Sequence, residues 1–399
     1  MNEKTEWLIT KLFIAYVLTT LIFPVAFFNK FFFICIFIIY MYIYPKIRPI
    51  INGPIIIAFI FTYGFLLSQF TYSDQSLSRS FLMSVILLFL IYPIMTFKVD
   101  FDKVISVGGR VLIIIDILFI MYGASKYAMT LPFGLNSLYN LIKDVIPSIF
   151  WEMIEKYGET AIGERGFFGD FNVMIHMGTV AFVYLPICLW YQKFLLEKKK
   201  SNLIWIFLGL FVIICSTSRA LLLVTLGMMI FIRIRECKSV EMKTIFVLLG
   251  VFLILIGTVY LIQKTAVFSS KELSNSIKIG HIASAIKSIS PAQILFGKGL
   301  ASYYYSTGVN AYLAHTEITL LDYFRYFGIL LGSTIYFKLV FPLEFGQNIK
   351  TIKQNNVLTE MCILGGYLII SLTNPVLMNS MGTLVVLWYW SKVSLSVYN

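Results

Sequence analysis

Long runs of apolar residues dominate this chain, and short polar segments separate them. A run such as 55–67, IIIAFIFTYGFLL, is continuous rather than alternating, which favours membrane-spanning helices over the strands of a β-barrel. A helix needs about 20 apolar residues to cross the hydrocarbon layer. The expected segments are 7–28, 31–45, 54–70, 80–97, 104–123, 171–191, 202–216, 219–233, 244–262, 319–343, 357–373 and 381–396. This pattern predicts about twelve spanning helices, or eleven if one of the short ones (the second, seventh or last) does not span.

Composition supports the same fold class. Hydrophobic residues make up 59% of the 399 residues and charged residues only 13%, whereas a soluble domain carries about 25% charge. We therefore expect an all-α, polytopic membrane protein whose residues 1–399 form a single membrane domain. The first apolar run lacks an A-x-A cleavage site, so it is expected to remain as an anchor. The five cysteines include no CxxC pair and suit small core positions without disulfides or a metal.

The net charge of +12 indicates topology rather than nucleic-acid binding, since the basic residues gather in alternate short loops. These loops carry Lys46 and Arg48, Lys98 and Lys103, Lys193 to Lys200, Arg233 to Lys238, and Lys350 with Lys353. The positive-inside rule places them, together with both termini, on the cytoplasmic side.

Two long loops, about 124–170 and 263–316, then fall on the external face, and loops of this length are often functional. Residues 136–157 of the first loop show helical spacing that suits a helix lying on the membrane surface. The second loop is rich in Ser and Lys and contains FGKGL, Phe296 to Leu300. This sequence lacks the Walker A spacing, which excludes an ATPase of that kind.

The most informative stretch is HTEITLLDYFRYFGILLG, 315–332, because charges beside an apolar run are costly and often mark a substrate site. If a helix starts near His315, then His315, Thr319, Asp322 and Tyr326 share one of its faces. Arg325 follows Asp322 by three residues, close enough to form an ion pair.

A neutral histidine at a membrane boundary can accept a proton from an alcohol, so His315 is the first candidate for a general base. Glu317, which falls on another side of that helix, is the alternative. A third interpretation is that His315 is an interfacial residue satisfied by a backbone carbonyl.

Two other stretches carry external arginines. In STSRALLLV, Arg219 stands at the start of a helix, where backbone N–H groups and a guanidinium fork suit phosphate oxygens, and Ser216, Thr217 or Ser218 can cap the helix. In GERGFFGDFNVMIH, 163–176, Arg165 is the cation, and Asp170 or Asn172 can cap the helix that we expect to open there. Simple solvation or snorkelling of each arginine is the structural alternative.

Other polar residues fit less well. Arg110 and Asp116 lie in one predicted span but on different faces, so each requires a partner on another helix. His176 suits a packed position, and His281 suits a solvated loop. No spacing of His, Cys and Asp suggests a metal site.

In the order RGFFGDFN, STSR and GKGL followed by HTEITLLDYFRYFG, residues 160–390 resemble the superfamily of O-antigen polymerases and O-antigen ligases. The resemblance implies a GT-C-like inner-membrane enzyme that transfers a glycan from undecaprenyl diphosphate to a hydroxyl group at the periplasmic face. It implies no metal or nucleotide cofactor. Arg219 matches the family's diphosphate-binding arginine, Arg165 matches an external-loop arginine that helps to hold the donor, and His315 matches the proposed base of the ligases. Asn172, Asp322, Arg325 and Tyr326 are the further candidates for substrate binding.

The polymerase reaction, for O-antigen or a related capsule, takes a lipid-linked oligosaccharide as both donor and acceptor. The partners expected are this lipid-linked substrate and membrane lipid, without nucleic acid, and a chain-length regulator protein is left open. The spacing after His315 departs from the ligase pattern, in which His-Asn is followed by nine residues and then Gly-x-x-Gly. The alternatives are an O-antigen ligase and, from another class, a flippase of lipid-linked oligosaccharides, in which polar groups should lie near the midplane.

Overall fold

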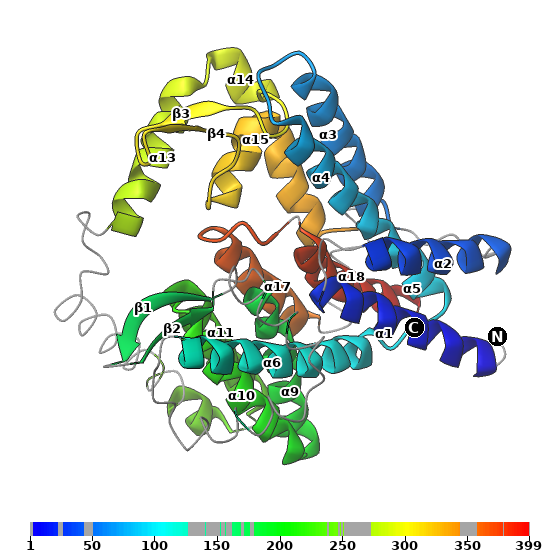
Figure 1. Ribbon diagram of the computed structural model, residues 1–399. Helices are drawn as coiled ribbons and strands as arrows, with labels where there is room; N and C mark the ends of the chain where they lie inside the picture. The colour runs from blue at the N-terminus through cyan, green and yellow to red at the C-terminus, as the bar shows by residue number, and fades with distance from the viewer. Residues whose placement is uncertain are drawn as a thin grey trace.

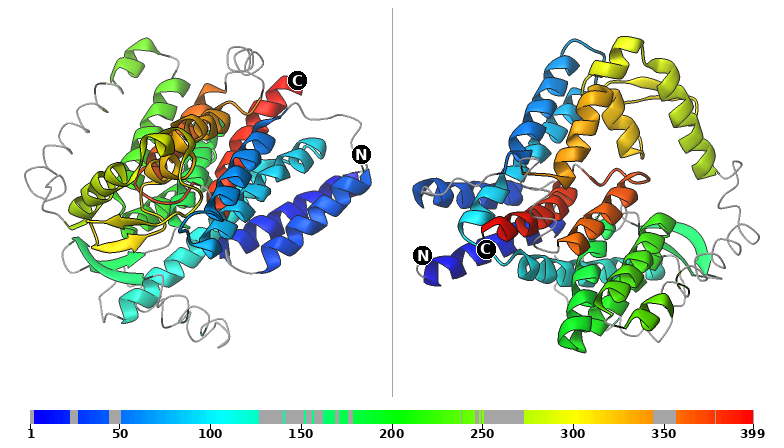
Figure 2. Two further views of the ribbon diagram at one scale, coloured as in Figure 1. Left: turned by 90° about the horizontal axis from the view of Figure 1, so that it is seen from above. Right: turned by 180° about the vertical axis from the view of Figure 1, so that it is seen from behind.

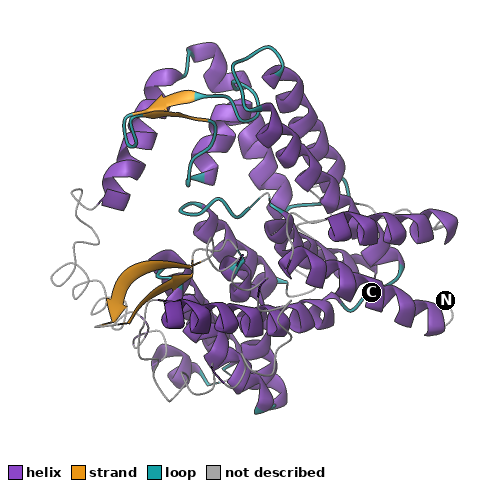
Figure 3. Cartoon of the chain, viewed as in Figure 1, coloured by secondary structure: helices purple, strands orange, loops and turns teal. Residues whose placement is uncertain are grey.

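The computed structural model describes residues 3–22, 27–43, 51–126, 162–168, 171–175, 179–237, 239–245, 273–343, 357–377 and 379–398, with a few single positions between them. Helices dominate this part of the chain, and two small antiparallel hairpins accompany them (Figures 1 and 3). The predicted helical class is therefore confirmed for these residues, whereas the hairpins were not predicted.

The elements follow one another along the chain with these bounds. The first half contains α1 (Glu3–Ile22), α2 (Phe27–Ile43), α3 (Gly53–Ser68), α4 (Gln75–Ile86), a 3-10 turn η1 (Leu87–Leu90), α5 (Ile91–Thr96), α6 (Phe101–Lys126), β1 (Ile162–Phe168) and β2 (Phe171–Ile175). The second half contains α9 (Val180–Glu197), α10 (Ser201–Cys215), α11 (Arg219–Glu236), α13 (Leu273–Ser288), α14 (Pro291–Phe296), β3 (Tyr304–Ser306), β4 (Ala311–Leu313), α15 (Thr319–Val340), α17 (Leu358–Ser371) and α18 (Ser380–Tyr398).

Several of these helices are suited to a membrane. Among the described residues, three are long and apolar enough to cross one, namely Gln75–Thr96, Phe101–Ala124 and Val180–Glu197, and five shorter apolar helices accompany them. Large apolar side chains also point outward, for example Phe59, Leu66 and Phe207, which are 74%, 57% and 68% exposed. Lipid can cover such side chains, which water would not favour.

Two predicted segments have a different structure. The segment 171–191 was expected to be helical from its start, but Phe171–Ile175 pairs with Ile162–Phe168 as a hairpin, and α9 begins only at Val180. Phe, Val and Ile in FNVMI favour a strand, and Gly169 and Asp170, which favour turns, separate the strands in the sequence. The loop 263–316 was expected to lack strong structure, yet it contains α13, α14, β3 and β4. The predicted span 244–262 and the surface helix at 136–157 lie almost wholly outside the described residues.

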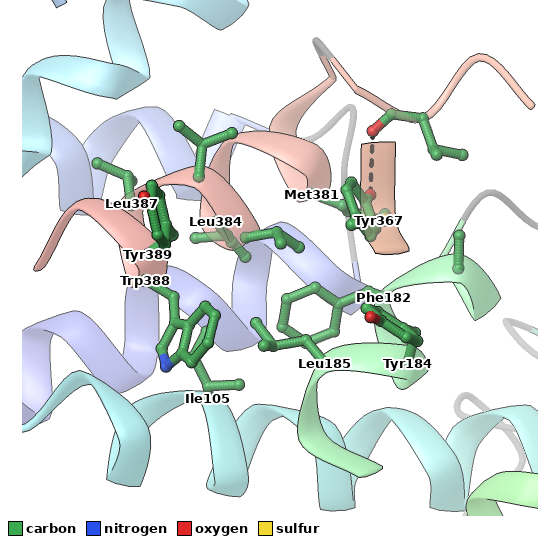
Figure 4. Packing of buried hydrophobic residues seen from close by; sticks show 14 of the residues in the cluster. Ile105, Phe182, Tyr184, Leu185, Tyr367, Met381, Leu384, Leu387, Trp388 and Tyr389 are labelled. Atoms are coloured by element: carbon green, nitrogen blue, oxygen red, sulfur yellow. Dashed lines mark hydrogen bonds between the residues drawn. The ribbon is translucent and has the colours of Figure 1, made fainter. Parts of the chain in front are cut away.

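The core forms where α9 and α18 meet α17 and α6. Residues 180–190 of α9 and 381–391 of α18 are buried on every side, so these two helices occupy the centre of the bundle. Figure 4 shows Phe182 and Leu185 of α9 packed near Leu384 and Trp388 of α18. Such all-round apolar helices belong in the interior, whereas the one-sided helices surround them.

Charged residues gather at one end of the bundle. Asp102, at the start of α6, lies 2.6 Å from Nζ of Lys392 on α18 and accepts a hydrogen bond from the Trp388 indole at 2.8 Å. Arg235, at the end of α11, and Glu360, at the start of α17, lie within electrostatic reach of the same group. The termini lie toward this end and the hairpins toward the other in the left view of Figure 2. The start of α6 and the end of α11, which adjoin basic segments predicted to share one side of the membrane, thus lie at the same end of the bundle.

A break in α15 positions the backbone of residues 297–299, which follow α14. Gly328 has φ 74° and ψ 176°, so the helix runs as two parts that meet there at an angle. The break frees the carbonyls of Arg325 and Tyr326, and they accept hydrogen bonds from the N–H groups of Lys298 and Gly299 at 2.8 and 3.0 Å. Gly297 of FGKGL therefore allows a close backbone approach to α15, and Gly299 allows one to Leu67 and Ser68 at the end of α3, as expected where a side chain has no room.

We expect Gly328→Ala to destabilise the protein by about 3 kcal/mol, through backbone strain and overlap. The φ of 74° disfavours a side chain, and an added Cβ would overlap the Leu295 carbonyl oxygen. Gly227→Ala in α11 is the matched control, since its Cβ would meet nothing within 4 Å and alanine favours a helix. Thermal unfolding of the purified protein in detergent measures both variants. Equal midpoints for the two would contradict the strained role of Gly328.

Candidate functional site

Arg325 of α15 contacts the chain at Ser302 and at Ala314, and its side chain is fully enclosed. One terminal nitrogen donates to the carbonyl oxygen of Ser302. The other donates to the Ala314 carbonyl at 2.7 Å and to Oδ1 of Asp322 at 3.0 Å. The predicted ion pair between Asp322 and Arg325 is thus confirmed. Because the pair is buried, removing one partner would leave an uncompensated charge.

Aromatic rings complete the enclosure of this guanidinium. Its central carbon lies 4.5 Å from the ring centre of Tyr304 and 4.7 Å from that of Tyr326, distances typical of cation–π contacts. Burial raises the pKa of Tyr304 to about 12, and the charge of Arg325 opposes this rise. The phenol is therefore neutral at physiological pH and acts as a packing and hydrogen-bonding group.

The same cluster fixes the backbone on both sides of His315. The Ala314 carbonyl, which precedes His315, accepts hydrogen bonds from Arg325 and from the Tyr326 hydroxyl at 2.6 Å. The Thr316 N–H, which follows His315, donates to Oδ2 of Asp322 at 2.7 Å. Asp322, Arg325 and Tyr326 were expected to touch substrate, but their polar atoms are directed at this segment of the chain. They hold both peptide groups of His315 in place.

His315 itself lies outside the helix, contrary to the expected helix start. Helix α15 begins at Thr319, because Thr316 makes local bonds that compete with helical ones: its hydroxyl accepts from the Ile318 N–H at 3.0 Å. The predicted face shared by His315, Thr319 and Asp322 on one helix is therefore wrong. The residues still meet, through the turn that leads into α15.

The imidazole of His315 is exposed, and its Nδ1 lies 3.2 Å from the Thr316 carbonyl. A carbonyl oxygen only accepts, so this contact assigns the proton to Nδ1 and leaves the lone pair on Nε2. Glu317, the other candidate base, is 56% exposed, and its carboxylate lies 3.5 Å from Nζ of Lys278 on α13. Both candidates stand on the surface, but the glutamate is engaged in an ion pair.

His281 is a residue whose place the sequence did not indicate. It was expected to be solvated in a loop, but it lies on α13 and is only 3% exposed. Its Nδ1 lies 2.7 Å from the Ser306 hydroxyl and 3.4 Å from that of Tyr304. The repeat of Ile277, His281, Ser284 and Ser288 along one helical face could have indicated α13, since these residues recur every three to four positions.

Burial lowers the pKa of His281 below its ordinary value, and the charge of Lys278 acts in the same direction, while Glu317 and Asp322 oppose it. The histidine is therefore neutral at pH 7. It joins α13 to the hairpin β3–β4, which also carries Tyr304. The groups that influence its charge include the segment around His315, so the two histidines belong to one unit of the structure.

Arg219 occupies the first position of α11, as predicted, and is half-buried. Ser218 caps the helix by accepting from the Leu221 N–H, which confirms the expected Ser/Thr cap. Gly366 of α17 packs beside Val224 of α11, and Glu360 lies near Arg235. These contacts make α17 antiparallel to α11, so the last turn of α17 lies at the level of Arg219.

The start of α15 lies near the same end of α17. The hydroxyl of Thr319 donates to the carbonyl of Asn374, in the turn that follows α17, at 3.3 Å. The N-terminal ends of α11 and α15 therefore lie at one end of the bundle, opposite Asp102 and Glu360.

Arg165 and Asn172 lie in the hairpin β1–β2, in strands rather than at a helix start. The helix opening that Asn172 was expected to cap is thus wrong. The positions of these two side chains fall outside the described part of the chain, as does His176. Glu164 pairs with Val173, one residue away from each candidate, so Arg165 and Asn172 belong to the same short hairpin.

We expect Arg325→Ala to cost about 3–5 kcal/mol, because Asp322 would remain as a buried unpaired charge. The segment 302–318 should then become sensitive to limited proteolysis at temperatures that leave the wild type intact. Lys278→Gln is the control, since it breaks an exposed pair and should cost at most about 1 kcal/mol. Equal proteolysis of both variants would contradict the central role of Arg325.

Acid should loosen the contact between α13 and the hairpin. The unfolded chain binds a proton at His281 below about pH 6.5, whereas the folded form resists it, so stability present at neutral pH is lost as pH falls toward the lowered folded pKa. Hydrogen exchange of residues 304–313, corrected for intrinsic rates, should therefore increase from pH 7.5 to 5.5. His281→Gln should remove this dependence and His315→Gln should keep it. A pH dependence that survives His281→Gln would contradict this assignment.

Among the described residues, no group of three or more His, Cys, Asp or Glu could hold a metal ion. Comparison of the chain with protein-family models, curated proteins and solved structures found no match. A function for this chain rests on the geometry around His315 and on the sequence motifs that lead to it.

Proposed function

We propose that this chain is a polymerase of lipid-linked oligosaccharides, for O-antigen or a related capsular polysaccharide. It transfers a glycan from undecaprenyl diphosphate to the hydroxyl group of a lipid-linked repeat unit at the periplasmic face of the inner membrane. The observation that carries the proposal is the exposed His315, whose two peptide groups are fixed by a buried cluster. Three buried side chains, those of Asp322, Arg325 and Tyr326, thus order the backbone on both sides of the accessible His315.

His315 acts as the general base in this proposal. Its Nδ1 proton faces the Thr316 carbonyl, which leaves the lone pair on Nε2 of this exposed side chain. This nitrogen therefore accepts the proton of an incoming sugar hydroxyl. General-base catalysis of this kind contributes roughly 100- to 10,000-fold. Glu317 serves as the second candidate, and its pair with Lys278 makes it the less available of the two.

The reaction also needs stabilisation of the negative charge that develops on the leaving diphosphate. The acceptor oxygen forms a bond to the anomeric carbon, the bond from that carbon to the diphosphate oxygen breaks, and undecaprenyl diphosphate leaves with the electron pair. Arg219, together with the positive end of the α11 helix dipole, stabilises the leaving diphosphate, and such a donor contributes ~3–4 kcal/mol in comparable sites. Arg165 is the second arginine assigned to the donor. The diphosphate is already an activated leaving group, so the step needs no nucleotide.

The buried cluster supports the same step indirectly. We assign Asp322, Arg325 and Tyr326 to positioning His315, since their polar atoms contact the peptides beside it. Asn172 remains a candidate for contact with the glycan. Positioning also contributes to the rate, because a base already held in one orientation loses little conformational entropy when the substrate reacts.

One observation favours the transporter alternative. Asp116 in α6 is fully buried, and neither of its carboxylate oxygens has a hydrogen-bond partner. A carboxyl group inside a membrane helix is costly and often marks a transport path. A flippase is therefore the second candidate function, and it requires no covalent change in the glycan.

The decisive test supplies purified protein in detergent with an undecaprenyl-diphosphate repeat unit and no nucleotide. A ladder of longer glycans on gel electrophoresis is the expected product. His315→Ala and Arg219→Ala should each lower the rate at least about 100-fold. Arg79→Ala, at an exposed arginine of α4 that has no role in the proposed site, is the matched control and should retain the rate.

Other outcomes assign other functions. Product that appears only on lipid A-core would identify a ligase. An unchanged glycan, together with movement of the lipid across liposome membranes, would identify a flippase. Wild-type turnover in both the His315 and the Arg219 variant would show that the site lies elsewhere.

A further inference from the structure

Helices α13 and α14 expose a set of large apolar side chains on one part of the surface. On α13 these are Ile279, Ile282 and Ile286, which recur at helical spacing, and α14 adds Ile294, Leu295 and Phe296. Each of the six is between 42% and 66% exposed. We call this set the α13–α14 face. Clustered apolar side chains of this size on a protein surface mark an interaction surface rather than a surface for water.

The opposite side of α13 already has its partner. His281, Ser284 and Ala285 are buried, and Ser284 bonds Thr307 in the turn of the β3–β4 hairpin at 2.8 Å between hydroxyl oxygens. Gly280 approaches Gly308 so closely that an added Cβ would overlap it. The helix is therefore amphipathic, with one side packed on the hairpin and the isoleucines on the other.

The α13–α14 face continues the apolar outer surface of helices that suit a membrane. The Phe296 carbonyl accepts a hydrogen bond from the Tyr63 hydroxyl of α3 at 3.0 Å, and the Leu295 carbonyl lies against Gly328 of α15. Figure 1 shows α14 beside the ends of α3 and α15. Residues Ile329 and Leu330, which directly follow the break, are also exposed. Lipid that covers α3 and α15 would thus reach α14 without interruption.

Charge favours the same partner. Residues 273–296 contain Lys278 and Lys287 and no Asp or Glu. Lys287, in the last turn of α13, is exposed, whereas Lys278 pairs with Glu317. An amphipathic helix with lysine and no acid suits the interface of a membrane that contains anionic lipids.

We propose that α13 and α14 lie in the outer interface of the lipid bilayer, with the α13–α14 face among the upper acyl chains and Lys287 at the headgroups. The attachment sets the depth of the segment around His315, because Lys278 on α13 holds Glu317 and His281 holds the hairpin that leads to His315. This inference does not depend on glycosyl transfer, since it follows from exposure, charge and continuity alone.

Photocrosslinking of the full chain tests the inference. The photoreactive residue p-benzoylphenylalanine replaces Ile282 or Ile286, both already exposed, and the protein is placed in liposomes of phosphatidylethanolamine and phosphatidylglycerol. Irradiation should add the mass of one phospholipid to the intact protein, as measured by mass spectrometry. The same residue in place of Asn310, exposed at the tip of the hairpin, is the control and should gain no lipid.

Three results would overturn the inference: a crosslink from 282 and 286 to a second copy of the chain, a crosslink to another protein in native membranes, or equal lipid labelling at 310. Absence of any lipid adduct at 282 and 286, in variants whose thermal midpoints match the wild type, would do the same. The adduct is read without any glycan substrate, so its failure is distinguishable from failure of the proposed polymerase activity.

Discussion

The segment around His315 depends on the buried ion pair between Arg325 and Asp322. Charges are costly to remove from water, and hydrogen bonds from both partners to the backbone offset part of this cost, while Nε of Arg325 stays buried without a hydrogen-bond partner. Arg325 bonds the carbonyls of Ser302 and Ala314, and Asp322 bonds the N–H of Thr316. Two segments that approach α15 from different directions are thereby attached to one turn of it. The accessible His315, which lies between Ala314 and Thr316, therefore depends on this buried pair for its order.

Local features of the structure could be predicted from the sequence. The pairing of Asp322 with Arg325 follows from a separation of three residues on a helix, and the cap by Ser218 follows from the preference of serine for helix starts. The bounds of α10 and α11 agree closely with the apolar runs that predicted them. In each case, the deciding interactions lie within one helical turn of the residues concerned.

Features that rest on distant contacts could not be predicted in the same way. The start of α15 depends on the bonds of Thr316 with Ile318 and with Asp322, which a uniform helical pattern from His315 does not reveal. FGKGL looked like a poor phosphate loop, but Gly297 fits against α15 just before the break at Gly328, and Gly299 fits against the end of α3. His281 was misplaced because its partner, Ser306, stands in a hairpin that the sequence did not suggest. The spacing of apolar residues describes a single helix or strand, whereas these contacts join one segment of the chain to another.

The two halves of the proposed reaction lie on elements that meet only indirectly in the described structure. Arg219 begins α11, which packs on α17, and α17 leads to Asn374, which accepts a hydrogen bond from the first residue of α15. The distance between the arginine and His315 therefore depends on how α17 is seated between α11 and α15. Donor and acceptor are both bulky lipid-linked glycans, so such a site must admit them and still bring the leaving diphosphate and the base into register. The Thr319 hydroxyl joins α15 to the turn after α17, whereas the hydrogen bonds that order His315 run between α15 and the segment that precedes it, so the two sets of contacts involve different atoms.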